Sequence, residues 1–160
     1  MKNKNPILVS ACLLGVNCQY NGESDLTKEL LEFLKDKGEF IAVCPEVWGG
    51  LPIPRDASQI VGGTGIDVVG GKAKVMSIKN KDVTNEFITG AERILQIAKE
   101  NNVELAILKA KSPSCGVGKI YDDLASRHLI DGDGVAAALL RKNGIKVMTE
   151  KDLIAGNWPK

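Results

Sequence analysis

Three of the four cysteines, Cys12, Cys44 and Cys115, each come shortly after a run of apolar, β-favouring residues. Such runs are typical of buried parallel strands, and the carboxyl ends of parallel strands meet at one edge of an open α/β sheet. We therefore expect the three thiols to lie close together although they are far apart in the sequence. Thiolates are soft ligands that suit zinc, copper and iron–sulfur clusters. The pattern predicts a thiolate metal centre at the edge of a sheet.

The three cysteines could also be core residues or ligands of a structural zinc ion. A free cysteine is among the most buried residue types, so any one of the three alone would be a core residue. Structural zinc sites usually pair two cysteines within a few residues and fill all four positions. Cys12 and Cys18 are too far apart for such a pair, and the single histidine, His128, lies in another segment, as expected of a surface or capping residue. Three thiolates without a fourth protein ligand describe a centre with one open position, as catalytic sites require.

Two polar residues near the cysteines carry further chemistry. Glu46 follows Cys44 by two positions, so it is a candidate general acid or base at the same pocket. Ser112 precedes Cys115 by three positions in a turn rich in polar donors, where its hydroxyl can orient a water or donate a proton. The alternatives are a solvated loop carboxylate for Glu46 and a Ser-Pro turn hydroxyl for Ser112.

Composition limits the class of protein. The chain has 160 residues, 44% of them apolar, which is enough for one domain over residues 1–160 with its own core. The 21 basic and 20 acidic residues leave a net charge of +1, so no broad basic surface for nucleic acid is expected. Four cysteines are too few for a disulfide-dense secreted domain. The apolar segment before Cys12 is shorter than the roughly 7–15 residues of a secretory signal, and none approaches the roughly 20 residues of a membrane span. We therefore expect a cytoplasmic protein with no membrane segment.

The predicted elements alternate between strands and helices. Strands are expected at residues 7–9, 40–43, 105–108 and 146–148. A first helix is expected from Ser24 as N-cap to Gly38, with Leu26, Leu30, Leu31 and Leu34 on its apolar face. A second is expected over residues 81–101, capped by Asp82 or Thr84. A third is expected from Asp133 as N-cap to Asn143-Gly144. The βαβ alternation predicts an α/β fold, a single-domain three-layer α/β/α sandwich with a Rossmann-like, mostly parallel sheet.

The middle of the chain is rich in glycine and proline. Residues 48–65 are predicted to form a long loop, of a kind that is often functional or mobile. Residues 66–69 and 72–77 flank Gly70-Gly71, a pair suited to a two-residue turn. We therefore expect an antiparallel β-hairpin added to the sheet.

Three segments, in order along the chain, form a recognisable series. They are Ser10-Ala-Cys-Leu-Leu-Gly with Cys18-Gln-Tyr-Asn-Gly, Cys44-Pro-Glu with Gly49-Gly-Leu and Pro54-Arg55, and Lys111-Ser-Pro-Ser-Cys-Gly. Through these motifs nearly the whole chain resembles the DUF523 family, which includes the thiouracil desulfidases. The resemblance implies a [4Fe-4S] cluster held by Cys12, Cys44 and Cys115 with the fourth iron open. It makes Cys18 a nearby residue that is not a ligand, and the role of Cys18 stays open.

The activity implied by the resemblance is that of an iron–sulfur-dependent carbon–sulfur hydrolase or lyase, a desulfidase. The sulfur of a thiolated pyrimidine, 2-thiouracil or 4-thiouracil, would bind the open iron, which acts as a Lewis acid. Water would attack the ring carbon, giving uracil and hydrogen sulfide. Glu46 and Ser112 match the positions proposed for proton transfer. The expected partner is a small thiolated nucleobase, and the oligomeric state is left open.

Two rival functions remain at this point. In the first, the same chemistry acts on a thiouridine nucleotide or on tRNA, with phosphate held by lysines of the predicted hairpin: Lys72, Lys74, Lys79 and Lys81. In the second, the thiolates bind zinc or oxidise reversibly in a sensor without catalysis. Salt-sensitive binding of tRNA would support the first rival. Full zinc occupancy that does not depend on activity would support the second.

Overall fold

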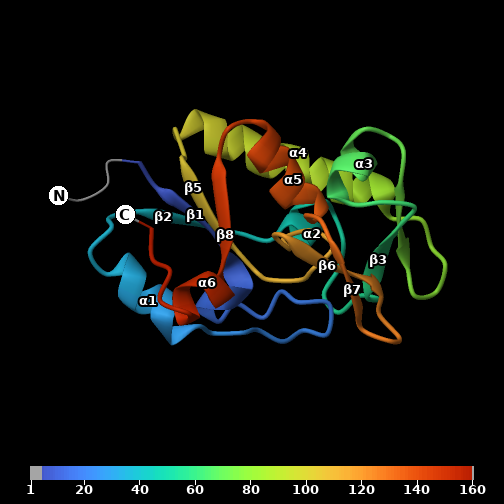
Figure 1. Cartoon of the computed structure of the whole chain (residues 1–160), viewed down its shortest axis with the longest axis horizontal. Coiled ribbons are helices and arrows are strands. Elements are labelled where there is room, and N and C mark those ends of the chain that lie inside the picture. The colour runs from blue at the N-terminus through green and yellow to red at the C-terminus, as the bar shows by residue number, and fades with distance from the viewer. Residues whose placement is uncertain (1–4, 160) are drawn as a thin grey trace.

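The centre of the fold is a four-stranded parallel sheet. The computed structural model describes residues 5–159, and the strands lie in the order β2-β1-β5-β8 (Figure 1). Their bounds are Ile7–Ser10 for β1, Phe40–Val43 for β2, Leu105–Leu108 for β5 and Lys146–Thr149 for β8. All four strands were predicted; the central strands β1 and β5 are covered on both faces and read as continuous apolar runs.

Helices cover both faces of this sheet. On one face lie α1 (Lys28–Leu34) and α6 (Glu150–Ile154), and on the other lie α4 (Thr84–Glu100) and α5 (Val135–Lys142) (Figure 1). The apolar side chains of β1 divide between the two layers: Ile7 and Val9 pack toward α1, and Leu8 packs toward α4 and α5. The predicted three-layer α/β/α sandwich is confirmed.

The first helix begins later than predicted. It starts at Lys28 after Thr27, and Ser24 does not cap it. The preceding loop is already tied to the end of β1, since the Asp25 and Thr27 amides donate to the carbonyl oxygens of Cys12 and Leu13. These bonds hold the loop against the residues that follow β1, and the helix begins only after Thr27. Of the four predicted core leucines, Leu30 and Leu34 are buried, whereas Leu26 and Leu31 are exposed.

The N-termini of the other two helices also differ in part from the prediction. Asp82 accepts a hydrogen bond from the Thr84 amide, but the N-cap of α4 is Val83, so neither predicted residue is the N-cap. Asp133 does not cap α5, whose N-cap is Gly134. Asp133 instead accepts bonds from the Gly118 amide and from the Arg141 guanidinium.

Antiparallel strands occur outside the main sheet, but not as the predicted hairpin. β3 (Ser58–Val61) lies within the predicted long loop and pairs with β4 (Lys74–Ser77). The segment between them forms a short helix, α3 (Gly65–Val69), started by a capping box of Thr64 and Asp67. The predicted turn at Gly70-Gly71 is therefore wrong: it ends a helix and does not join two strands. A second pair, β6 (Lys119–Asp123) with β7 (His128–Asp131), was not predicted.

A short helix, α2 (Pro45–Trp48), continues directly from β2 and carries Glu46. The chain leaves the sheet at Pro45 as predicted, and α2 then packs closely against α4. This approach needs two glycines, because a side chain at Gly90 would overlap the Pro45 carbonyl oxygen and one at Gly49 would overlap the Glu86 carbonyl oxygen. The backbone that presents Glu46 is thus placed by backbone contact with the longest helix.

We expect the Gly90→Ala variant to be destabilised by about 1–3 kcal/mol, the usual cost of overpacking a closed contact. Alanine is the better helix former by roughly 0.8–1.0 kcal/mol, so propensity alone predicts the opposite sign. Thermal unfolding measures the difference, and Glu92→Ala on an exposed position of α4 is the control. A midpoint at or above that of the unaltered protein would contradict the close contact.

Among residues 5–159, none of the helices combines the length and the apolar character that crossing a bilayer requires.

Candidate active site

The predicted site residues lie around one pocket of about 780 Å³. The pocket opens at the carboxyl ends of β1, β2 and β5, on the side of the sheet where β6 and β7 lie (Figure 1). Its lining includes all five residues that the sequence singled out: Cys12, Cys44, Cys115, Glu46 and Ser112. Residues at the ends of three strands therefore line one pocket, as the sequence predicted.

Each of the three cysteines is placed by the end of a different strand. Cys12 lies in a 3₁₀ turn, η1 (Ala11–Leu14), that follows β1. Cys44 precedes α2 at the end of β2, and Cys115 lies in the turn after β5. Cys12 and Cys115 are buried and Cys44 is partly exposed. The neighbouring strands thus bring together thiols separated by up to 103 residues.

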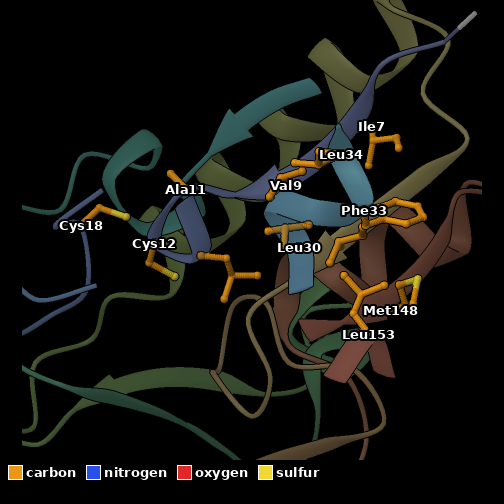
Figure 2. Packing of buried hydrophobic residues seen from close by; sticks show 12 residues of the cluster. Ile7, Val9, Ala11, Cys12, Cys18, Leu30, Phe33, Leu34, Met148 and Leu153 are labelled. Atoms are coloured by element: carbon orange, nitrogen blue, oxygen red, sulfur yellow. The ribbon is translucent and has the colours of Figure 1, made fainter. Parts of the chain in front are cut away.

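The fourth cysteine, Cys18, is also part of this group. Its thiol contacts the thiols of both Cys12 and Cys44, and its side chain is buried. Figure 2 shows Cys12 and Cys18 together at the end of the apolar cluster that lies opposite Phe33. The structure therefore places four thiols at the pocket, where the sequence predicted three with Cys18 nearby.

The thiols of Cys18, Cys44 and Cys115 sit in surroundings that favour their protonated form. Burial raises the pKa of Cys115 to about 12, although the Ser10 hydroxyl, 3.4 Å from the sulfur, acts in the opposite direction. The adjacent Cys18 thiol, together with burial, raises the pKa of Cys44 far above that of a free thiol. Contact with Cys12 raises the pKa of Cys18. In the metal-free protein Cys44 and Cys115 are therefore thiols at neutral pH.

Glu46 is held by two partners. Its Oε1 lies 3.0 Å from Nε of Arg55, and its Oε2 accepts a 2.8 Å hydrogen bond from the Ser114 hydroxyl. The side chains of Glu46 and Arg55 are 15% and 5% exposed, so Glu46 is not a solvated loop carboxylate. Arg55 also donates to the Cys18 carbonyl oxygen at 2.9 Å.

Ser112 does not contact Glu46 directly. Its Oγ accepts a 2.8 Å hydrogen bond from the Cys115 amide and lies 3.4 Å from Oγ of Ser114. Sequence reasoning missed both Arg55 and Ser114 as site residues. Each stands inside a motif quoted above, Arg55 in Pro54-Arg55 and Ser114 directly before Cys115. Their place in these motifs was the sequence feature that could have identified them as site residues.

Charged side chains also line the pocket. Lys109 lies 3.0 Å from Asp25 and 3.9 Å from the buried Glu150. Burial acts to lower the pKa of Lys109, but the two carboxylates outweigh it and raise that pKa. Lys111, Arg127 and Lys151 also line the pocket.

The lysines that the sequence suggested for phosphate, Lys72, Lys74, Lys79 and Lys81, are not among the residues that line the pocket. One of them, Lys79, lies 3.4 Å from Asp56. His128 has a 65% exposed side chain that bonds to Asp122, as expected of a surface residue.

Known proteins are similar to this chain in sequence, and one of them in fold. The model of the 2-thiouracil desulfurase family matches residues 7–152. A Bacillus subtilis (strain 168) protein, described as "Uncharacterized protein YbbK", is 45% identical over 147 residues, which cover 92% of this chain and 97% of that protein. A solved structure, described as the [4Fe-4S]-dependent thiouracil desulfidase TudS (DUF523), matches with a TM-score of 0.82 and 38% identity over 95% of each chain. The chain therefore belongs to the 2-thiouracil desulfurase family.

Proposed function

We propose that this protein is a [4Fe-4S]-dependent desulfidase that removes sulfur from a thiolated pyrimidine of the 2-thiouracil or 4-thiouracil type, giving uracil and hydrogen sulfide. One observation carries the proposal: thiols from three strand ends line the pocket that also contains the Glu46 carboxylate. Family membership and the likeness to TudS support the same chemistry.

The donor set fits an iron–sulfur cluster. The thiolates of Cys12, Cys44 and Cys115 are the ligand type that such clusters use, and each comes from a separate backbone segment. Among residues 5–159 no three His, Cys, Asp or Glu side chains gather tightly enough to hold a single metal ion. Cluster ligands each bind a different iron, so they need not converge on one point. When bound, the cluster would supply an open iron that acts as a Lewis acid toward the substrate sulfur.

The residues of the chain would supply positioning and proton transfer. Glu46 accepts a proton from the water that attacks the ring carbon and gives it up as the carbon–sulfur bond breaks. Arg55 and Ser114 hold the carboxylate while this happens. Ser112 lies at the pocket beside Ser114, where its hydroxyl can orient the water. The overall reaction exchanges the substrate sulfur for a water oxygen and leaves hydrogen sulfide.

A second substrate class, the thiouridine nucleotides, is favoured by basic side chains at the pocket. Lys111, Arg127 and Lys151 line it, and they are suited to a phosphate group. The pocket volume of about 780 Å³ lies in the upper part of the range of about 300–1,000 Å³ that small-molecule sites span. The net charge of +1 offers less support for tRNA.

Anaerobic reconstitution with iron and sulfide tests the function and selects the substrate. The measurement is kcat/KM for sulfide release from 2-thiouracil, 4-thiouracil, a thiouridine monophosphate and thiouridine-containing tRNA. A preference for the nucleotide that Arg127→Ala reduces, and that Lys72→Ala leaves intact, would select the nucleotide. A preference for the free base that neither variant changes would select the base. A colourless, zinc-binding and inactive protein would instead support the sensor function.

The pH dependence of cluster loading is a further prediction. Because the pKa values of Cys44 and Cys115 are raised, both thiols must release a proton when they bind iron. Protons therefore compete with iron at every pH below these values. We expect cluster retention against a chelator to keep rising up to pH 9 and beyond, whereas unshifted thiols with a pKa of about 8.5 would level off there. Iron release measured from pH 6 to pH 10 tests this, and a plateau below pH 8 would contradict it.

A further inference from the structure

Glu46 has both carboxylate oxygens engaged inside the pocket wall. Arg55 bonds to Oε1 and Ser114 bonds to Oε2, at 3.0 and 2.8 Å. Ser114 is 2% exposed and the Arg55 side chain is 5% exposed. Neither bond therefore exchanges freely with water, and together they leave the carboxylate little freedom to rotate.

The hydrogen bonds on both sides of Ser114 are donated in the direction of Glu46. A carboxylate paired with arginine only accepts hydrogen bonds, so the single hydroxyl proton of Ser114 is committed to Glu46. In the 3.4 Å contact between the two serine hydroxyls, Ser112 must then be the donor. The Ser112 oxygen in turn accepts the Cys115 amide. The series leads from the backbone of Cys115 through Ser112 and Ser114 to Glu46.

Arg55 links Glu46 to the loop that contains Cys18 and Tyr20. Its terminal nitrogens donate to the carbonyl oxygens of Cys18 and Pro52, at 2.9 and 3.2 Å. Its amide donates to the Tyr20 carbonyl oxygen at 2.8 Å. Arg55 thus fixes Glu46 relative to the loop that carries Cys18.

We propose that Arg55 and Ser114 are the positioning residues of this site, which fix the two oxygens of Glu46 for proton transfer. The catalytic consequence rests on the proposed desulfidase function. The coupling between Glu46 and Ser114 does not depend on that function, so it can be measured without substrate or cluster.

A double-mutant cycle in the cluster-free protein tests the coupling. Residues in direct contact are non-additive, whereas residues that share no partner are close to additive. We expect Ser114→Ala to lower the thermal midpoint by roughly 2–6 °C, and by less than half as much in the Glu46→Ala background. Ser77→Ala is the control, since it also removes a buried serine hydroxyl, one that bonds to the Lys79 and Lys81 amides and shares no partner with Glu46. Its shift should be the same in both backgrounds.

The loaded enzyme gives the second readout. Misplacing a proton-transfer group lowers kcat more than it raises KM. We expect Ser114→Ala to lower kcat roughly 10–100-fold with KM within about twofold and iron content unchanged. Ser114→Thr, which keeps the hydroxyl, should recover most of kcat. Arg55→Lys, which keeps the charge but loses the planar fork, should lower kcat without loss of iron.

The outcomes separate the two proposals. Additive midpoints for Ser114→Ala and Glu46→Ala would overturn the positioning role, whatever the activity. An unchanged kcat in Ser114→Ala would overturn it as well. An inactive, fully loaded wild-type protein that still shows the coupling would refute the proposed function and leave the contact between Ser114 and Glu46 established.

Discussion

Replacing Cys12, Cys44 or Cys115 by serine is expected to reduce iron from about four atoms per chain to less than one after anaerobic reconstitution. Each variant removes one of the three thiolates, and a serine oxygen is a harder and less acidic donor than cysteine sulfur. Desulfidase activity should fall below detection with the iron. Iron analysis and the visible spectrum of each purified variant measure the loss.

Cys18→Ser is the matched control for this series. It makes the same sulfur-to-oxygen change within the same group of thiols, where Cys18 contacts Cys12 and Cys44. We expect it to keep iron and most of the activity, because three ligands leave one iron open for substrate and a fourth would close it. If Cys18→Ser lost its iron completely and one of the other three variants kept it, Cys18 would be the ligand in place of that residue.

Glu46→Gln is expected to lower kcat by about 10²–10⁴ while iron content stays at the wild-type level. Glutamine has the same shape, but it cannot accept the proton, and its amide nitrogen would face either Arg55 or Ser114, which both donate. Steady-state sulfide release at saturating substrate measures the change.

The same substitution also has a structural effect that must be separated from catalysis. It leaves the buried Arg55 without its partner charge, and breaking a buried pair costs about 3–5 kcal/mol. Unfolding of Glu46→Gln should therefore be compared with that of Glu92→Gln, an exposed position on α4. Turnover close to wild type in a folded Glu46→Gln protein would remove Glu46 from the mechanism.

The parallel sheet and the position of the cysteines were predictable because they depend on local signals. Strands such as β1 and β5 are buried on both faces, so their sequences are continuously apolar. The rule that ligands gather at the carboxyl ends of parallel strands then placed the three thiols at one edge. No tertiary contact had to be known for either step.

The parts that were missed depend on contacts between distant segments. Glu46 and Ser114 are 68 residues apart, and nothing local to Ser114 indicates that it bonds to a carboxylate. The antiparallel pairing of β3 with β4 was missed because β3 lies within a segment rich in glycine and proline and a helix, α3, separates the two strands. Gly70-Gly71 satisfied the turn pattern equally well at the end of that helix.

The order of the strands has a consequence for chain synthesis. β1 pairs with β2 and with β5, so the thiols at the ends of β1 and β2 become neighbours as soon as the first third of the chain has folded. The third thiol belongs to residue 115 of 160, and β5 must pair with β1 to bring it into place. A nascent chain or a fragment that stops before Cys115 therefore lacks one of the three proposed cluster ligands. If the proposed cluster needs all three thiolates, it can be completed only after β5 has joined the sheet.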